Sequence, residues 1–302
     1  MNTRTAVITG ASAGLGLECA RALLATDASW HVVLAVRDAG RGADAVAALG
    51  EPTRCTVLEL DLASLRSVRG FAQNLRAAEL PPVHALVCNA GVQMVSSSEV
   101  TDDGVEMTFG VNHLGHFALV HEVLDHLTRP ARIVVVSSGT HDPAKHTGMP
   151  APRYTSAAEI ASPAAGGTSG EGRRAYTTSK LCNVLFTYEL DRRLGHGEQG
   201  VTVTAFDPGL MPGSGLARDY PPLQRLAWRY LFPALRVLPG VRSTRTSGRY
   251  LAALAGDARF DGVTGEYFEG RKPIRSSADS YDHDKALDLW TTSEQLVTRV
   301  TK

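Results

Sequence analysis

Short apolar runs without polar alternation recur along the first two thirds of the chain, separated by segments of helical periodicity. Such runs, rich in Val, Ile and Leu, are typical of strands that are covered on both faces of a sheet. The pattern predicts strands at 4–9, 30–37, 54–60, 83–88, 131–138, 201–207 and 265–269.

Helical segments fall between these runs and after the last of them. They are predicted at 15–25, 41–49, 65–78, 103–127, 174–194 and 284–300. Repeated alternation of strand and helix indicates a parallel sheet, and right-handed crossovers place helices on both of its faces. We therefore predict an α/β fold, a doubly wound and mostly parallel seven-stranded Rossmann sheet in which 265–269 closes an edge.

Two stretches interrupt this alternation. Residues 139–175 are rich in Gly, Pro, Ala and Ser and are longer than most connections, so we expect a long insertion loop there. Residues 213–241 carry several prolines among Leu, Trp, Tyr and Phe, and we interpret them as short helices that form a substrate lid. No repeat and no domain boundary is visible, which predicts one domain over 1–302.

Charge and composition narrow the class of protein. Thirty-one basic residues balance thirty-one acidic ones, which makes nucleic acid an improbable partner. The four cysteines form no CxxC pair and lie in apolar segments, and the N-terminus runs directly into a strand. No apolar run approaches the roughly 20 residues that span a bilayer. We expect a reduced, cytoplasmic protein that is soluble or at most peripheral.

The first predicted strand leads into a glycine-rich turn that opens a helix. Gly10, Gly14 and Gly16 follow Thr9 in this turn. Glycines there permit a tight turn, a close approach of backbone to phosphate, and tight contact between helix and strand. Because the following helix presents free N–H groups and a positive dipole end, the motif predicts a dinucleotide site.

A tyrosine and a lysine share one helix face further along the chain. Tyr176 and Lys180 are four residues apart, about one helical turn. A nearby ammonium favours the phenolate form of a tyrosine, which lets the phenol exchange a proton with a substrate oxygen. A solvated helix face is the alternative interpretation of this pair.

These motifs resemble the short-chain dehydrogenase/reductase family, and further matches follow in the family's order. They are the Gly-x3-Gly-x-Gly spacing, Asp61 after the third strand, Cys88-Asn89-Ala90-Gly91 after the fourth, Asn112 in a helix, Ser137-Ser138 after the fifth, Tyr176-x3-Lys180, and Pro208-Gly209 after the sixth.

The resemblance implies a role for each matching residue. Tyr176 is the acid/base group, Lys180 also holds the nicotinamide ribose, Ser138 hydrogen-bonds the reacting oxygen, and Asn112 positions a water of a proton relay. Alternatively, Ser137 or Thr140 takes the place of Ser138, Asn112 braces its helix, and Asp61 caps a helix. The implied coenzyme-binding residues are Gly10, Ser12, Ala13, Gly14, Leu15, Gly16, Arg37, Asp61, Leu62, Asn89, Ala90, Gly91, Tyr176, Lys180, Pro208, Gly209 and Ser214.

Arg37 at the end of the second strand points to NADP as the coenzyme. NAD sites usually place a carboxylate there for the ribose hydroxyls. A guanidinium instead pairs with a 2′-phosphate, and Ser12 adds a hydrogen bond. Asp38 is one residue past the usual acid position. No metal is expected, because the gaps between His113, His116, His121 and His126 scatter these side chains around a helix.

Within the family, the chain looks most like light-dependent protochlorophyllide reductases and retinol-dehydrogenase-like members. The likeness includes 30–38, 61–68, 112–117, 176–193, 215–233 and the segment around Trp290. Protochlorophyllide reductases carry a cysteine for the pigment site after Pro-Gly, and Leu210 stands there instead. A leucine cannot supply thiol chemistry, which favours a dark reaction.

We therefore expect an NADP(H)-dependent enzyme that interconverts a carbonyl and an alcohol on a bulky lipophilic substrate. Reduction of a conjugated C=C bond and a non-catalytic dinucleotide sensor are the alternatives. The apolar stripe of 213–241 is interpreted as core, pocket wall or membrane-surface contact. Self-association through 174–194 remains open.

Overall fold

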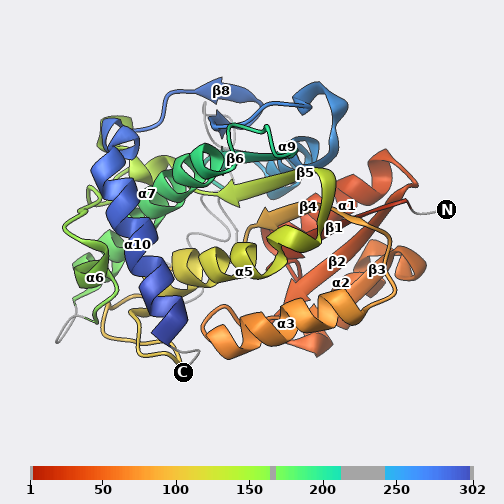
Figure 1. Ribbon diagram of the computed structural model, residues 1–302, viewed down its shortest axis with the longest axis horizontal. Coiled ribbons are helices and arrows are strands. Elements are labelled where there is room, and N and C mark those ends of the chain that lie inside the picture. Colours follow the sequence, from red (N-terminus) through yellow and green to blue (C-terminus); the bar gives the residue numbers. More distant parts are fainter. Residues whose placement is uncertain (1–2, 164–167, 212–241, 300–302) are drawn as a thin grey trace.

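The central sheet has eight strands in the order β3-β2-β1-β4-β5-β6-β7-β8 (Figure 1). The computed structural model describes residues 3–163, 168–211 and 242–299. The strands are β1 (Arg4–Thr9), β2 (Trp30–Val36), β3 (Cys55–Glu59), β4 (Val83–Cys88), β5 (Leu127–Val136), β6 (Val201–Asp207), β7 (Glu266–Glu269) and β8 (Lys272–Ile274). Strands β1 to β7 are parallel to their neighbours, and the pair β7–β8 is antiparallel.

The predicted doubly wound parallel sheet is confirmed, but the number of strands and the edge were wrong. Strand β8 pairs with β7, so β7 is an inner strand and β8 forms the edge. The chain reverses at Gly270, whose φ of +65° lies in the left-handed region that glycine tolerates. Strand β8 is only three residues long and contains Pro273, so it gave no strand pattern in the sequence.

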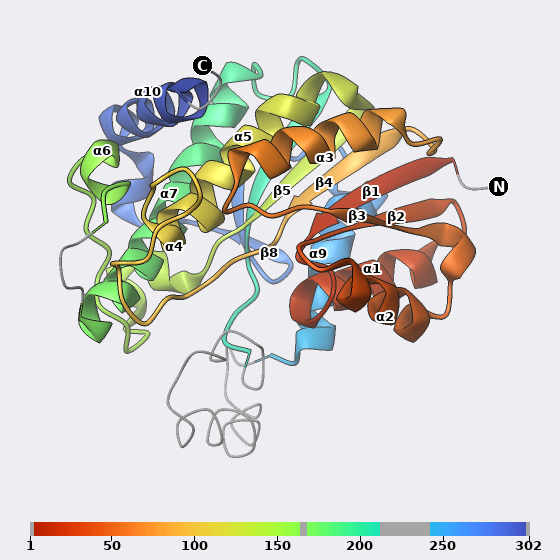
Figure 2. The same ribbon diagram turned by 90° about the horizontal axis from the view of Figure 1, so that it is seen from below.

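Helices cover both faces of the sheet (Figure 2). Helices α1, α2 and α9 pack on one face, and α3, α5, α7 and α10 lie on the other. The helices are α1 (Gly14–Thr26), α2 (Ala39–Leu49), α3 (Leu65–Ala77), α4 (Met107–Phe109), α5 (Gly115–Val123), α6 (Ala157–Ile160), α7 (Ser169–Arg193), α9 (Thr244–Gly256) and α10 (His283–Arg299). Among the described helices, none has the length and apolarity to cross a membrane.

The predicted helix at 103–127 is broken into several pieces. Helix α4 begins after Glu106, whose carboxylate accepts from the Phe109 N–H at 2.6 Å. A π-helical turn at Gly110–Leu114 follows, then α5, a 3₁₀ turn at Leu124–His126, and the start of β5 at Leu127. A π turn adds a residue to the helix and is frequent at functional sites. The continuous apolar pattern concealed these breaks.

The predicted loop at 139–175 is shorter than expected. It holds 3₁₀ turns at Gly139–His141 and Pro143–Lys145 as well as α6, and α7 already begins at Ser169. Thr168 caps α7, because its hydroxyl accepts from the Glu171 N–H while the Glu171 carboxylate accepts from the Thr168 N–H. This capping box, Thr-x-x-Glu, was visible in the sequence. The predicted lid at 213–241 lies outside the described residues.

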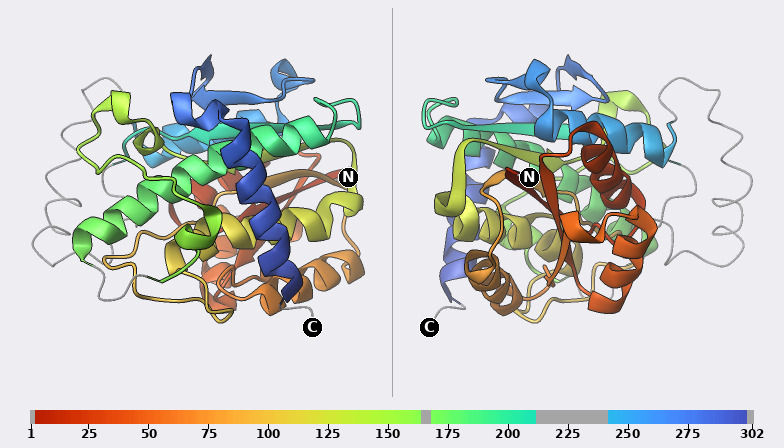
Figure 3. Two further views of the ribbon diagram at one scale, coloured as in Figure 1. Left: turned by 60° about the vertical axis from the view of Figure 1, so that its left-hand side comes forward. Right: turned by 90° about the vertical axis from the view of Figure 1, so that its right-hand side faces the viewer.

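Helix α10 lies across α7 and packs an aromatic side chain between α5 and α7 (Figure 3). The Trp290 ring meets Phe117 edge-on at 5.0 Å between ring centres and stacks on Phe186 at 6.0 Å. The Arg193 guanidinium lies 4.1 Å from the Trp290 ring centre, and the indole N–H donates to Glu294 at 2.7 Å. The C-terminal helix is thus part of the core.

Replacing Trp290 with alanine is expected to lower the free energy of unfolding by about 3–5 kcal/mol, because it empties this aromatic cluster. Urea denaturation followed by circular dichroism measures the loss. Leu287→Ala on the same helix is the control, since Leu287 is half exposed and its truncation should cost less than about 0.5 kcal/mol. Equal losses for the two variants would contradict a core role for Trp290.

All four cysteines are free thiols. Cys19, Cys88 and Cys182 are buried, and Cys55 is partly exposed. Burial raises the pKa of the Cys55 thiol to about 11 and that of the other three thiols still further. Thiols that stay protonated are inert packing groups.

Candidate active site

Several of the predicted coenzyme and catalytic residues follow the carboxyl ends of strands. Gly10 follows β1, Arg37 follows β2 and Asn89 follows β4. Ser138 comes two residues after β5, and Pro208 comes directly after β6. Because these strands are parallel, the residues lie along one edge of the sheet. The strand order reverses between β1 and β4, which is where open α/β sheets bind ligands.

The glycines after β1 differ in their surroundings. Gly10 and Gly14 have φ angles of +66° and +59°, which favour glycine. A Cβ at Gly16 would lie 2.7 Å from Asn89 Nδ2 and 2.8 Å from the Gly10 carbonyl oxygen. A Cβ at Gly14 would meet no described atom within 4 Å. The motif therefore combines a tight turn, a close helix contact and an open cradle.

Helix α1 begins at this cradle without a side-chain cap. Its N-cap residue is Ala13, preceded by Ser12, and its first turn carries no acidic residue. Leu15 points into the core on the other side. The first-turn N–H groups and the positive end of the helix dipole therefore lie at the open space, as in sites that bind phosphate. These residues fit the diphosphate of a dinucleotide.

The Thr9 hydroxyl holds the loop after β4 in place. It accepts from the Asn89 and Ala90 N–H groups at 2.8 and 2.9 Å. Its own proton has two acceptors within reach, His116 Nε2 at 2.9 Å and the Val87 carbonyl oxygen at 3.3 Å. His116 then donates from Nδ1 to the Asn112 carbonyl oxygen at 3.2 Å. Burial lowers the pKa of His116 to about 4, so the ring is neutral, as this pattern requires.

The Asn112 side chain joins the loop after β4 to α7. Its Oδ1 accepts from the Val92 N–H at 2.7 Å, and its Nδ2 donates to the Val92 carbonyl and the Ser179 hydroxyl, both at 2.9 Å. A Cβ at Gly91 would lie 3.2 Å from Asn112 Oδ1 and 3.6 Å from Lys180 Nζ. These contacts agree with the alternative interpretation, in which Asn112 braces its helix. The role of Asn112 in a proton relay stays a prediction.

Tyr176 and Lys180 are both buried on α7. The Lys180 ammonium lies 5.5 Å from the centre of the Tyr176 ring. It donates to the Val136 carbonyl oxygen at 3.2 Å, and Asn183 donates to the same oxygen at 3.0 Å. Burial lowers the pKa of Lys180 to about 8, although the charge of Asp207 acts in the opposite direction. The end of β5 thus fixes an ammonium beside a phenol.

Two serines follow β5, and their hydroxyls differ in availability. The Ser137 hydroxyl is buried and donates to the Lys180 carbonyl oxygen at 2.8 Å, which commits it to α7. The Ser138 hydroxyl is partly exposed and accepts from the Thr140 N–H at 3.3 Å. Of these two, Ser138 is therefore the one free to donate to a substrate oxygen.

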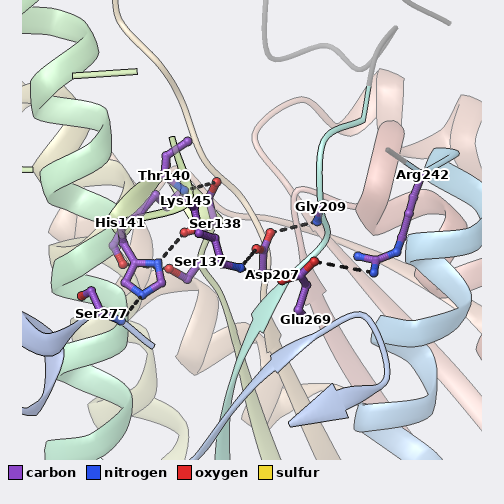
Figure 4. Close-up of polar contacts among 11 residues, drawn as sticks. Ser137, Ser138, Thr140, His141, Lys145, Asp207, Gly209, Arg242, Glu269 and Ser277 are labelled. Carbon is purple, nitrogen blue, oxygen red and sulfur yellow. Dashed lines mark hydrogen bonds and ion pairs between the residues drawn. The ribbon is translucent and has the colours of Figure 1, made fainter. Parts of the chain in front are cut away.

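A buried histidine supports the Ser138 backbone. His141 Nδ1 donates to the Ser138 carbonyl oxygen at 2.7 Å, and Nε2 accepts from the Ser277 N–H at 3.1 Å (Figure 4). Burial lowers the pKa of His141, in keeping with a neutral ring that donates once and accepts once. The sequence gave no signal for this role, because Ser277 is 136 residues away.

The end of β2 separates the roles of two charged residues. Asp38 is the N-cap of α2, and its carboxylate accepts from the Arg41 N–H at 3.0 Å. The neighbouring Arg37 is exposed. The cap uses Oδ1 of Asp38, and Arg37 places a guanidinium directly before it at this strand end.

Asp61 makes a local turn after β3. Its carboxylate accepts from the Ala63 N–H at 2.9 Å. Helix α3 begins only at Leu65, and the N–H of Leu65 donates to the Asp103 carboxylate at 2.8 Å. The alternative in which Asp61 caps this helix is therefore wrong. Leu62 is buried, and adenine contact by these two residues stays a prediction.

The turn after β6 is fixed from two sides. The Gly209 N–H donates to Asp207 at 2.8 Å, and the Pro208 carbonyl accepts from the Ser247 hydroxyl of α9 at 2.6 Å. Gly209 has a φ of +76°, so the turn needs glycine here. Ser214, predicted to contact the nicotinamide carboxamide, lies outside the described residues.

A charged cluster beside this turn was missed by the sequence analysis. Lys145 Nζ lies 2.6 Å from Glu269 and 3.5 Å from Asp207, and Arg242 lies 3.9 Å from Glu269 (Figure 4). Its one visible signal was Asp207, the acid that ends the otherwise uncharged strand β6. Lys145 and Glu269 are 124 residues apart, so their pairing depends on the fold.

Comparisons with known proteins agree with this geometry. The family model described as "short chain dehydrogenase" matches residues 4–157. "Protochlorophyllide reductase B, chloroplastic" of Hordeum vulgare is 37% identical over 98% of this chain and 79% of its own length. The crystal structure of an uncharacterised protein from Mycobacterium paratuberculosis is 31% identical with a TM-score of 0.71, covering 98% of this chain and 94% of that one.

A more distant structure shows the same fold. The blue fluorescent protein from a metagenomic library, solved in complex with NADPH, is 24% identical to this chain with a TM-score of 0.63. The match covers 89% of this chain and 98% of that one. The shared architecture thus extends over most of the described elements.

Proposed function

The chain belongs to the short-chain dehydrogenase family of oxidoreductases, and we propose that it transfers hydride between NADP(H) and the carbonyl or alcohol carbon of a bulky lipophilic substrate. The observation that carries the proposal is the buried pair of Tyr176 and Lys180, 5.5 Å from ring centre to ammonium. The pair lies at the sheet edge that also carries the glycine cradle. One catalytic domain over 1–302 is part of this proposal.

The side chains divide the proton chemistry between them. When bound, NADP(H) supplies or accepts the hydride. In the direction of reduction, the Tyr176 phenol gives its proton to the substrate oxygen, and in oxidation the phenolate takes that proton back. The Lys180 ammonium stabilises the phenolate and would hold the nicotinamide ribose. The Ser138 hydroxyl donates to the same substrate oxygen and stabilises its developing charge.

Arg37 supports NADP over NAD. It is exposed at the end of β2, next to the Asp38 carboxylate that α2 uses as a cap. A guanidinium placed there pairs bidentately with a 2′-phosphate and offers nothing equivalent to ribose hydroxyls. Ser12, in the turn after β1, is proposed to add a hydrogen bond to the same phosphate.

Replacing Arg37 with glutamine is expected to raise the KM for NADPH by roughly 10-fold or more, the value of a charge-assisted pair of about 1.5–3 kcal/mol. The KM for NADH should change little, because NADH has no 2′-phosphate. Steady-state kinetics with both coenzymes measures the difference. Arg41→Gln is the control, since only the backbone N–H of Arg41 is engaged at Asp38. A wild-type enzyme that prefers NADH would refute the assignment.

Reduction of a conjugated C=C bond is the second candidate. The Hordeum vulgare relative, named protochlorophyllide reductase, matches almost the whole length of this chain. Against it stands Leu210, because the resemblance implies a cysteine of the pigment site there. Leu210 is half exposed and has no acidic proton to give. The carbonyl reaction needs only groups that this chain possesses.

An NADPH-oxidation screen over lipophilic aldehydes, ketones and enones, with protochlorophyllide included, tests the proposal. Each substrate is measured in darkness and under illumination. Dark turnover of a carbonyl compound supports the first candidate, whereas turnover of the tetrapyrrole only in light replaces it with the second. Tight NADPH binding without turnover of any substrate would favour a dinucleotide sensor.

Location and partners complete the proposal. A reducing cytoplasm suits the four free thiols. Membrane-surface contact was predicted for 213–241, which lie outside the described residues. Self-association through 174–194 stays a prediction, and in this structure α10 lies across that helix.

A further inference from the structure

Asp207, at the end of β6, and Lys180, on α7, lie on two elements that pack against each other. Val184 of α7 and Ala205 of β6 belong to one buried apolar cluster, and α7 lies against β6. Lys180 lies one helical turn before Val184, about 6 Å along the helix. Asp207 lies two residues after Ala205 on the same strand face, about 6.6 Å along the strand.

The direction of the two elements brings these side chains together. Helix α7 connects the parallel strands β5 and β6, so it runs back against the strand direction. The residues nearer the N-terminal end of α7 therefore lie beside the C-terminal end of β6. Lys180 and Asp207 consequently face each other across the α7–β6 contact, at the edge where the Val136 carbonyl receives the Lys180 ammonium.

We propose that Asp207 is the electrostatic partner of Lys180, and that the pair Lys145–Glu269 determines how much of the Asp207 charge Lys180 experiences. Asp207 acts through Lys180 and is a positioning residue. The proposal concerns the site of the proposed function and rests on that function only for the use made of Lys180.

Distances within the charged cluster show how the charge is divided. Lys145 Nζ makes its short contact, 2.6 Å, with Glu269 and stays 3.5 Å from Asp207. Lys145 is therefore neutralised mainly by Glu269. Asp207 is buried, and its Oδ2 lies against the backbone of Gly139, where a Cβ would approach it to 2.9 Å. Its Oδ1 accepts from the Gly209 N–H at 2.8 Å, and Lys145 offsets its charge only in part (Figure 4).

The histidine that faces Lys180 is neutral. Within the described residues, Tyr176 from α7 and His116 from α5 face Lys180 besides Asp207. Burial lowers the pKa of His116 to about 4, so the imidazole carries no charge near neutral pH.

The same holds on the far side of the carboxylate. His141 from the turn after β5 and Tyr267 from β7 face Asp207. Burial lowers the pKa of His141 and raises that of Tyr267 well above its ordinary value, so both are uncharged. Asp207 therefore opposes the effect of burial on Lys180 and keeps its ammonium protonated.

Lysine side-chain NMR tests the proposal without turnover. The chain has five lysines, so labelling with ¹³Cε-lysine gives few signals. The signal that is missing in a Lys180→Arg variant is that of Lys180. In coenzyme-free protein Asp207→Asn should move the Lys180 titration to lower pH by roughly one unit. Lys145→Met removes a competing cation and should move it to higher pH. Glu269→Gln releases Lys145 toward Asp207 and should move it to lower pH.

The opposite signs separate this role from a structural one. Asp191→Asn is the control, because Asp191 is a buried carboxylate at the far end of α7, and it should leave the Lys180 titration unchanged. Shifts of one sign in Lys145→Met and Glu269→Gln, or a shift in Asp191→Asn as large as in Asp207→Asn, overturn the proposal. Should Asp207→Asn not fold, the opposite signs of Lys145→Met and Glu269→Gln decide it.

Turnover provides an independent reading. In active enzyme the alkaline limb of kcat/KM should follow the Lys180 titration in each variant, in the same order and sign. Absence of reductase activity on every substrate contradicts the proposed function and leaves the NMR result standing, so the two failures are distinguishable.

Discussion

Tyr176→Phe is expected to lower kcat/KM by about 10²–10⁴-fold, the usual contribution of a positioned acid/base group. The substitution removes one oxygen from a buried side chain and leaves the ring beside Lys180 in place. Coenzyme affinity should stay close to that of the parent enzyme, because the glycine cradle and the helix end of α1 are untouched. Steady-state kinetics and a fluorescence titration with NADPH measure the two quantities.

Tyr188→Phe is the matched control for this prediction. Tyr188 lies on the same helix, and its hydroxyl bonds to the Ser276 hydroxyl at 2.7 Å, away from Lys180. Its loss should cost about 1 kcal/mol of stability and leave kcat/KM nearly unchanged. Full activity in Tyr176→Phe, or equal losses of activity in both variants, would refute acid/base catalysis by Tyr176.

Gly16→Val is expected to weaken coenzyme binding by roughly 10-fold or more, because a hydrogen bond from the helix end to a charged phosphate is worth about 1.5–3 kcal/mol. A Cβ at position 16 would lie 2.7 Å from Asn89 Nδ2 and 2.8 Å from the Gly10 carbonyl. Helix α1 must therefore move away from the loop after β4, at a cost of about 1–3 kcal/mol in stability. A fluorescence titration with NADPH and thermal unfolding measure the two effects.

The control for Gly16 is a glycine in open surroundings. Gly70 lies inside α3, and a Cβ there would meet no described atom within 4 Å. Gly70→Ala should leave NADPH affinity unchanged and stabilise the protein by up to about 1 kcal/mol through helix propensity. Unaltered coenzyme affinity in Gly16→Val would show that the helix contact does not shape the cradle.

The buried strands were the most predictable part of the fold. Strands β1, β4 and β6 begin and end at the predicted residues, because their side chains are covered on both faces and the apolar run stops where burial stops. The site residues that follow these strands were predictable for the same reason. Once the strands are parallel, their ends share an edge.

Elements fixed by distant contacts were not predictable. The π turn at Gly110–Leu114 interrupts an apolar pattern that is continuous in the sequence. Strand β8 is defined by its pairing with β7 and by little in its own residues. The contact between His116 Nε2 and the Thr9 hydroxyl joins residues 107 apart in the sequence. Hydrogen bonds of this kind arise only when the chain is folded.

The Arg242 N–H donates to the Leu210 carbonyl oxygen at 2.9 Å, which has a consequence for how such an enzyme diversifies. The backbone leaves the end of β6 and returns to α9 at adjoining points, which this hydrogen bond joins. The entropic cost of closing a loop grows only slowly with the number of residues in it, so a longer connection between these points costs little more than a short one. Connections of different length or sequence between these two points are therefore expected to leave the sheet and α9 in place.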